Sequence, residues 1–327
     1  MSRWNARALH AALACASIAA FTAHAHAQSY PAKPVRIIVP WTAGGTADLL
    51  ARVLAQKMTE SFGQQVIADN RPGAGGLIGT EIAAKAAPDG HTLLMGTTAP
   101  NSVAPSLYSK IPFDPARDFA YLSLVARTCY VLSVHPSMPV KTVRDLIALA
   151  KARPGSLDYG SAGHGTSNHM AMALFESLAG IKLVHVPYKG TGQALADLVA
   201  GQIPVLFGNI LSCLPYVRAG RLRALGVSSA KRSVAVPDVP TIAEAGVPGY
   251  VTTTWHGWLA PAGTPSPVVQ RLSGEIARVV KSPDFIEKIS TDGGEPVGST
   301  PEQFTKHIAI EIARWRKVVK MTGMRVE

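Results

Sequence analysis

The stretch from Val35 to Leu50 (VRIIVPWTAGGTADLL) places the strongest constraint on how this chain can fold. Its β-branched apolar run, Val35–Val39, predicts a short buried strand, and the amphipathic pattern from Thr46 onward predicts a helix. Between them, Pro40 and the pair Gly44-Gly45 predict a tight loop. Such a loop leaves unpaired backbone N–H groups at a helix N-terminus, where the helix dipole favours negative charge. The stretch therefore predicts a loop that binds an anion.

Alternation of short strands and helices occurs twice along the chain, from Val35 to Met95 and again from Leu157 to Val227. A strand–helix–strand alternation is typical of a parallel sheet covered by helices, so the pattern predicts two α/β lobes. The length of 327 residues and the 47% hydrophobic content are sufficient for two cores. We expect the first crossing between the lobes to lie between the apolar segments 121–126 and 130–134. The proline-started helices 267–281 and 301–322 are expected to return to the first lobe.

Residues 1–27 have the pattern of a secretory signal peptide. Arg3 and Arg7 precede an apolar run from Ala8 to Phe21, and Ala25-His26-Ala27 fits a small-residue cleavage site. A membrane anchor is the less favoured alternative because the run is shorter than the ~20 residues needed to span a bilayer. The mature chain is thus expected to be exported. Its two cysteines, Cys129 and Cys213, could form a disulfide or remain as two buried thiols.

The formal net charge of +11 does not by itself indicate nucleic-acid binding. Lysine and arginine are scattered, with no run longer than two, such as Lys231-Arg232. We expect no nucleic-acid partner and a mild preference for acidic small molecules.

A second glycine turn, Ser161–Ser167, precedes a helix in the second lobe and resembles the first turn in type. Two anion-binding turns that face each other would suit a dicarboxylate. Asp48 follows the first turn, and a carboxylate there would repel an anionic ligand, so we expect it to cap the helix or to orient the loop. Tyr188 and Lys189 end a strand at the same edge of the second lobe; they could line the cleft or form a surface turn.

The sequence matches the known catalytic, metal-binding and cofactor-binding motifs poorly. Ser161 lacks the glycine two residues before it that a nucleophile elbow requires, because Tyr159 occupies that place. His164 and His169 are five residues apart without a nearby carboxylate, which predicts no metal site. Gly73–Ile78 departs from the dinucleotide fingerprint at its last position, so no cofactor is expected. The segment Trp255–Trp258 is interpreted as core or hinge packing.

With these residues the chain resembles the Bug family of periplasmic solute-binding proteins, which are the TctC-like receptors of tripartite tricarboxylate transporters. The motifs that carry the resemblance are Tyr30–Arg36, Pro40–Asp48, Asn70–Gly76, Pro88–Gly90, Tyr159–Thr166, His185–Gly190, Pro240-Thr241 and Glu244–Gly246. The resemblance implies a two-lobed periplasmic-binding-protein (Venus-flytrap) fold with a mostly parallel sheet in each lobe. The implied lobes are residues 28–128 with 250–327, and residues 129–249, joined by two crossings.

The resemblance also implies a function: a monomeric, non-enzymatic periplasmic receptor that captures a small organic acid and passes it to transporter membrane components or to a sensor kinase. The alternative is an exported hydrolase or isomerase that uses Ser161 with His164 or His169. The role of His169 is not fixed by the resemblance. The expected ligand-binding residues are Trp41, Thr42, Ala43, Gly44, Gly45, Thr46, Asp48, Ser161, Ala162, Gly163, Thr166, His169, Tyr188 and Asn209.

Three residues depart from the family's usual pattern: Trp41 replaces phenylalanine, His91 replaces tyrosine, and Gly208 replaces aspartate. Gly208 is expected at a strand end beside the cleft, where an acid could pair with a ligand amino group. Its absence predicts a plain carboxylate ligand in place of an amino acid, and Trp41 is expected to influence ligand choice.

Overall fold

The computed structural model describes residues 30–324, so the predicted signal peptide lies outside the described residues. The described residues from Lys33 onward form one compact unit, whose fold is given below. Among the described helices, none combines the length and the apolar character that crossing a membrane requires.

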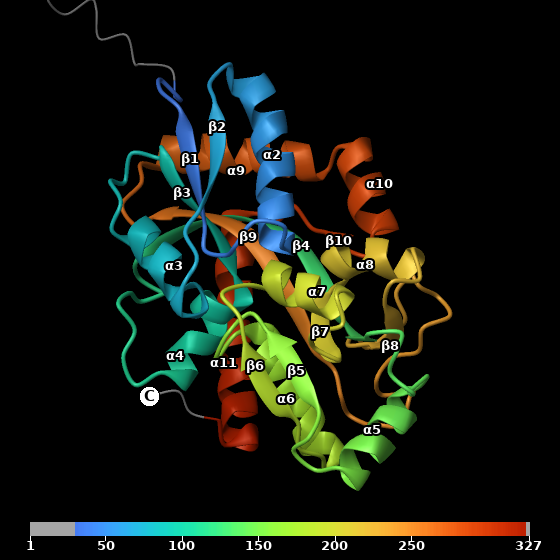
Figure 1. Cartoon of the computed structure of the whole chain (residues 1–327). Helices are drawn as coiled ribbons and strands as arrows, with labels where there is room; N and C mark the ends of the chain where they lie inside the picture. The colour runs from blue at the N-terminus through green and yellow to red at the C-terminus, as the bar shows by residue number, and fades with distance from the viewer. Residues whose placement is uncertain (1–29, 325–327) are drawn as a thin grey trace, which may run out of the picture. The chain divides into compact units, whose positions relative to one another are not determined.

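The first sheet contains the strand that precedes the predicted anion-binding loop. β1 lies between β2 and β3 and pairs with both in parallel, whereas β9 runs antiparallel to β3 and to β4, and β10 runs antiparallel to β4. Helices surround this sheet (Figure 1). The elements are β1 (Val35–Val39), α2 (Thr46–Phe62), β2 (Val66–Asn70), η2 (Ala74–Gly76), α3 (Leu77–Ala84), β3 (Thr92–Thr97), η3 (Ala99–Val103), α4 (Ala104–Leu107), β4 (Phe119–Val134), β9 (Thr253–Pro261), α9 (Ser266–Val280), α10 (Pro283–Thr291), β10 (Glu295–Pro296) and α11 (Pro301–Thr322).

The second sheet carries the second glycine turn. β5 pairs in parallel with β6 and β7, and the end of β4 runs antiparallel to β7 and β8. Its elements are α5 (Val143–Ala152), β5 (Asp158–Ser161), α6 (Ser167–Ala179), β6 (Val184–Pro187), α7 (Thr191–Val199), β7 (Val205–Asn209), α8 (Ile210–Arg218) and β8 (Arg223–Val227). The expectation that each sheet is mostly parallel is wrong, because the long strands β4 and β9 add antiparallel pairs and make the sheets mixed.

β4 connects the two sheets without a break. Its first part pairs with β9 as far as Cys129, and its last part, from Tyr130, pairs with β7. We expected the crossing between the apolar segments 121–126 and 130–134; the change of partner falls there, and one continuous sixteen-residue strand includes both segments. Apolar or small side chains at nearly every position allow burial on both faces, which explains the uninterrupted strand.

Each sheet has its own core, and a smaller cluster joins elements of both. Tyr121, Trp255 and Phe304 pack in the first core, whereas Phe175 and Phe207 pack in the second. In the joining cluster, Trp315 of α11 lies with Val103, Leu107 and Met170. Helix α11 therefore contacts α6 of the second lobe as well as the first lobe.

Besides the three-residue turn η2, two helical segments were not predicted: α10 and the π-helical turn η3 with α4. α10 is short, and only Phe285 and Ile289, four residues apart, are fully buried, so its periodic signal is brief. Prolines at 100 and 105 concealed the second segment, although proline near a helix start is compatible with helix. Cys129 and Cys213 are both free and buried, in agreement with the thiol alternative.

Candidate functional site

A pocket lies where the first glycine loop, the second glycine turn and strand β9 meet. Its cavity volume is about 50 Å³, which is smaller than that of most small-molecule sites. The lining residues are Trp41, Thr42, Gly45, Thr46, Ala47, Thr97, Tyr130, Ala162, Thr166, Ser167, Asn168, Thr191, Asn209, Thr254 and His256. Within the described residues, no lysine, arginine, aspartate or glutamate side chain belongs to this lining.

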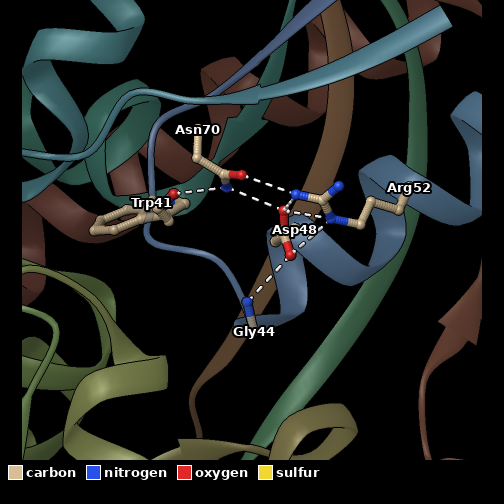
Figure 2. Close-up of polar contacts among 5 residues, drawn as sticks. All are labelled: Trp41, Gly44, Asp48, Arg52 and Asn70. Atoms are coloured by element: carbon tan, nitrogen blue, oxygen red, sulfur yellow. Dashed lines mark hydrogen bonds and ion pairs between the residues drawn. The ribbon is translucent and has the colours of Figure 1, made fainter.

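Asp48 holds the first loop in place through a group of hydrogen bonds (Figure 2). Its carboxylate accepts from the Gly44 N–H at 3.1 Å, from Arg52 Nε at 3.0 Å and from Asn70 Nδ2 at 3.0 Å. Asn70 Nδ2 also donates to the Trp41 carbonyl at 3.0 Å. Both ends of the loop are thus connected to one buried carboxylate, which agrees with the supporting role expected for Asp48.

The same bonds determine the charge of Asp48. Burial alone would raise the pKa of this carboxyl, but the bonds from Arg52, Gly44 and Asn70 outweigh it and hold the pKa below its usual value. Because Gly44 donates its N–H to Asp48, the expectation that this amide is available to a ligand is wrong. Ala43 and Gly44 are exposed outside the pocket lining, while Gly45 is buried and lines it.

The second turn is organised by Asn168 and Thr166. Thr166 Oγ1 donates to the Gly163 carbonyl at 2.7 Å and to Asn168 Oδ1 at 2.8 Å. Asn168 Oδ1 also accepts from the Ala162 and His169 backbone N–H groups at 3.3 and 3.1 Å. These contacts fix the turn against the start of α6, so that residues 162 and 166–168 form one wall of the pocket.

Ser161 lies beneath this wall and does not line the pocket. It is fully buried, and its Oγ is 2.5 Å from His185 Nε2. The hydrolase alternative paired Ser161 with His164 or His169, so the structure differs from the arrangement it requires. His169 accepts a hydrogen bond from the Gly165 N–H through Nδ1 at 3.0 Å.

His164, His169 and His185 form a cluster whose nearest ring nitrogens lie within 4.8 Å of one another. The rings of His169 and His185 are stacked, with centroids 3.9 Å apart and planes at 9°. A metal ion binds close to the plane of each imidazole, so two stacked rings cannot both coordinate one ion in this arrangement. Burial, together with the neighbouring histidines, lowers the pKa of His169 to about 3 and that of His185 to about 4, which keeps both neutral.

Strands β3 and β9 form the base of the pocket. Thr97 and His256 are register partners on these strands, and Trp41 Nε1 donates to Thr97 Oγ1 at 3.1 Å. Burial lowers the pKa of His256 to about 4, so this side chain is neutral near pH 7. The prediction of core packing holds for Trp255 and Trp258, both almost fully buried, but is wrong for His256, which lines the pocket.

Four buried side-chain polar atoms of lining residues have no hydrogen-bond partner within the described part of the chain. They are Thr42 Oγ1, Thr46 Oγ1, Asn168 Nδ2 and His256 Nδ1. Buried polar groups are nearly always hydrogen-bonded. Unpartnered atoms around one pocket therefore require partners bound there, which water or a ligand can supply.

The two lobes touch beside the pocket. A Cβ added to Gly192 of α7 would stand 2.7 Å from the Ala43 carbonyl oxygen of the first loop. Similarly, a Cβ on Gly75 would stand 3.1 Å from the His164 carbonyl oxygen, which also accepts a hydrogen bond from Tyr108 Oη at 3.3 Å. These segments therefore approach each other closely, and glycine permits the close approach.

Gly208 does not border the pocket as we expected. A side chain at this position would collide with Cys213 Sγ inside the second lobe, and Gly208 is absent from the lining, whereas Asn209 belongs to it. The argument that an aspartate at position 208 would face the ligand is therefore wrong for this chain.

Seven of the expected ligand-binding residues line the pocket, in the first loop, the second turn and at the end of β7: Trp41, Thr42, Gly45, Thr46, Ala162, Thr166 and Asn209. The others lie outside the lining: Ala43, Gly44, Asp48, Ser161, Gly163, His169 and Tyr188. The Tyr188 hydroxyl donates to Asp197 on α7 at 2.7 Å. Sequence reasoning missed Ala47, Thr97, Tyr130, Ser167, Asn168, Thr191, Thr254 and His256. Two of these, Ser167 and Asn168, follow the second turn directly and could have been included.

Known proteins share this fold and sequence pattern. The model of the TctC family, "Tripartite tricarboxylate transporter family receptor", matches residues 50–324. Protein BugT of Bordetella pertussis is 38% identical over 94% of this chain and 95% of its own length. A solved structure described as "R. palustris Rpa4515 with adipate" is 39% identical, with a TM-score of 0.88 over 91% of this chain and 99% of that chain. The structure of MatC from Rhodopseudomonas palustris with bound malate is 31% identical, with a TM-score of 0.85 over 89% of this chain and 100% of that chain.

These similarities and the pocket between two mixed sheets define the class: an α/β binding protein with two lobes, as the Bug and TctC structures have. The chain belongs to the tripartite tricarboxylate transporter family of receptors.

Proposed function

We propose that the protein is a non-enzymatic receptor that binds a small dicarboxylate in the pocket between its lobes. The observation that carries the proposal is the set of unpartnered atoms in the lining, because Thr42 and Thr46 belong to the first lobe and Asn168 to the second. Hydroxyl and amide hydrogens from opposite sides suit a ligand with an acceptor group at each end. The adipate and malate in the two R. palustris structures are dicarboxylates and support this ligand class.

Neutral donors are sufficient for tight binding. A hydrogen bond to a charged group contributes about 1.5–3 kcal/mol, and a micromolar complex requires about 8 kcal/mol. Three or four such bonds, from groups such as Thr42, Thr46 and Asn168, reach this value without an arginine. The lining has no carboxylate within the described residues. A ligand ammonium group would lack a charged partner there, which favours a plain acid over an amino acid.

The proposal includes export and delivery. Residues 1–27 direct the chain to the periplasm, where it passes the ligand to membrane components of a tripartite tricarboxylate transporter or to a sensor kinase. The lobes are residues 28–128 with 250–327, and residues 129–249, and they close on the ligand. A hydrolase using Ser161 finds less support, because this serine is fully buried and lies outside the pocket lining.

Calorimetry with adipate, malate, succinate, aspartate and butyrate tests the proposal. We expect at least one unsubstituted or hydroxylated dicarboxylate to bind with a micromolar or lower Kd, and aspartate and butyrate to bind at least tenfold more weakly. Tighter binding of aspartate than of every plain dicarboxylate, or no binding of any dicarboxylate, would overturn the ligand assignment. Small-angle scattering with and without the tightest ligand tests closure, for which we expect a smaller radius of gyration in the complex.

A further inference from the structure

Asn168 occupies a position in which its side-chain amide can have only one orientation. It is the second residue of α6, its side chain is almost fully buried, and it lines the pocket. Its Oδ1 accepts three hydrogen bonds, from Thr166 Oγ1 and from the backbone N–H groups of Ala162 and His169. A flipped amide would direct its NH₂ group toward the backbone N–H groups of Ala162 and His169 and lose both of those bonds, because an N–H group cannot accept.

The fixed oxygen leaves the NH₂ group facing the pocket. Nδ2 is buried and has no partner among residues 30–324, so both of its hydrogens remain to be satisfied. Asn209, the other asparagine of the lining, differs. Its Nδ2 donates to Thr128 Oγ1 at 2.5 Å, and its Oδ1 accepts from the Leu211 N–H at 3.2 Å as the cap of α8. Both the oxygen and the nitrogen of the Asn209 side-chain amide are therefore hydrogen-bonded within the protein.

We propose that Asn168 is a specificity-determining residue that acts only as a hydrogen-bond donor and recognises one carboxylate of the ligand. This inference rests on the proposed function and extends it. A carboxylate offers acceptors in every orientation, whereas a primary amide offers a single oxygen and an ammonium group offers none. The order of preference at this end of the ligand is therefore carboxylate, then amide, then ammonium.

Asn168→Asp provides a sharp test. The two side chains have nearly the same shape, and one aspartate oxygen can still accept from Thr166, Ala162 and His169. The other oxygen replaces the NH₂ donor with an acidic acceptor. At pH 7.5 we expect the variant to bind the preferred dicarboxylate about 100-fold more weakly, because a donor is lost and a like charge is gained. The half-amide of the same acid, which can donate to the aspartate, should then bind at least as tightly as the diacid.

Asn209→Asp is the matched control, because it adds the same charge to the lining and leaves the Asn168 amide in place. This variant measures the effect of the added charge alone, so we expect it to shift affinity from diacid toward half-amide by a smaller factor than Asn168→Asp does. Calorimetry supplies the affinities, and thermal unfolding establishes that each variant is folded. A folded Asn168→Asp variant that binds the diacid within threefold of the parent, or that keeps the parent's preference, would overturn the inference.

A second measurement applies to the parent protein if Asn168→Asp does not fold. The side-chain NH₂ signals of Asn168 in a ¹H–¹⁵N spectrum should shift strongly when the dicarboxylate binds, and unchanged signals would overturn the inference. The proposed function fails in a different way, when the parent binds none of the dicarboxylates. Binding by the parent with no response at Asn168 rejects the inference alone.

Discussion

Gly192→Ala should separate ligand binding from stability. Gly192 lies in the first turn of α7, where alanine favours the helix by up to about 1 kcal/mol. In the structure, however, the new Cβ would stand 2.7 Å from the Ala43 carbonyl oxygen, whereas ordinary contact begins near 3.4 Å. The first loop and α7 must therefore separate by about 0.7 Å. The contacted atom belongs to the backbone of a loop that Asp48 holds in place, so it cannot move aside as the end of a flexible side chain could.

This overlap costs free energy only while the first loop and α7 are in contact, which the proposed closure on the ligand requires. Overpacking of this kind costs roughly 1–3 kcal/mol, and about 2 kcal/mol corresponds to a Kd increased about 30-fold. Calorimetry with the tightest dicarboxylate measures this change, and thermal unfolding without ligand measures stability. We expect the Tm of the variant to equal or exceed that of the parent while its Kd rises.

Gly274→Ala in α9 is the control, because a Cβ there meets no atom within 4 Å and gains the same helix preference. It should raise the Tm slightly and leave the Kd unchanged. An unchanged Kd in Gly192→Ala, or an equal weakening in both variants, would refute the idea that the glycine contact permits closure.

Three further predictions concern the pocket and its supports. Trp41→Phe removes the hydrogen bond to Thr97 Oγ1, and we expect it to change the ranking of dicarboxylates in calorimetry more than it changes the Tm; identical rankings would contradict this. Asp48→Asn removes the charge that accepts from Gly44 and Arg52, so affinity should fall about tenfold and the Tm should fall as well, whereas an unaltered affinity would show that the loop does not need this anchor. The third concerns pH. Burial lowers the pKa of His256 to about 4 in the folded chain, whereas its pKa in the unfolded chain is near 6.5. Between these two pH values the unfolded chain binds a proton at His256 and the folded chain does not. Stability should therefore decrease as pH falls from about 6.5 to about 4, with a contribution on the order of 3 kcal/mol from this group. Urea unfolding midpoints should fall less steeply with decreasing pH in His256→Asn than in the parent. Parallel curves for the two proteins would show that His256 does not cause the loss of stability.

The fold could be predicted wherever one local pattern decides the structure. The β1–α2 stretch has a β-branched run, a proline–glycine loop and an amphipathic helix, and the structure contains all three. The strand at the crossing was harder to predict, because the apolar segments 121–126 and 130–134 of β4 are separated by residues that include the polar pair Arg127-Thr128. Pairing with β9 and then with β7 carries the strand through this pair. Such tertiary pairing overrides local preference.

The pocket could be predicted only in part, for a similar reason. Loops at helix N-termini are visible in sequence, and they supply Thr42, Thr46 and Thr166. His256 and Thr254 lie in a strand whose buried residues resemble an ordinary core. Only the pairing of β9 with β3 and β4 brings these side chains beneath the loop. Likewise, sequence alone could not show that the Gly44 amide is occupied by Asp48.

A crystal structure of the complex with the tightest-binding dicarboxylate tests the central claim most directly. We predict that one carboxylate lies within about 3.2 Å of Thr42 Oγ1 or Thr46 Oγ1, and the other within about 3.2 Å of Asn168 Nδ2. The Gly44 N–H should remain bonded to Asp48. A dicarboxylate bound elsewhere on the protein, or bound in the pocket without contact to Asn168 and to the first loop, would contradict the account.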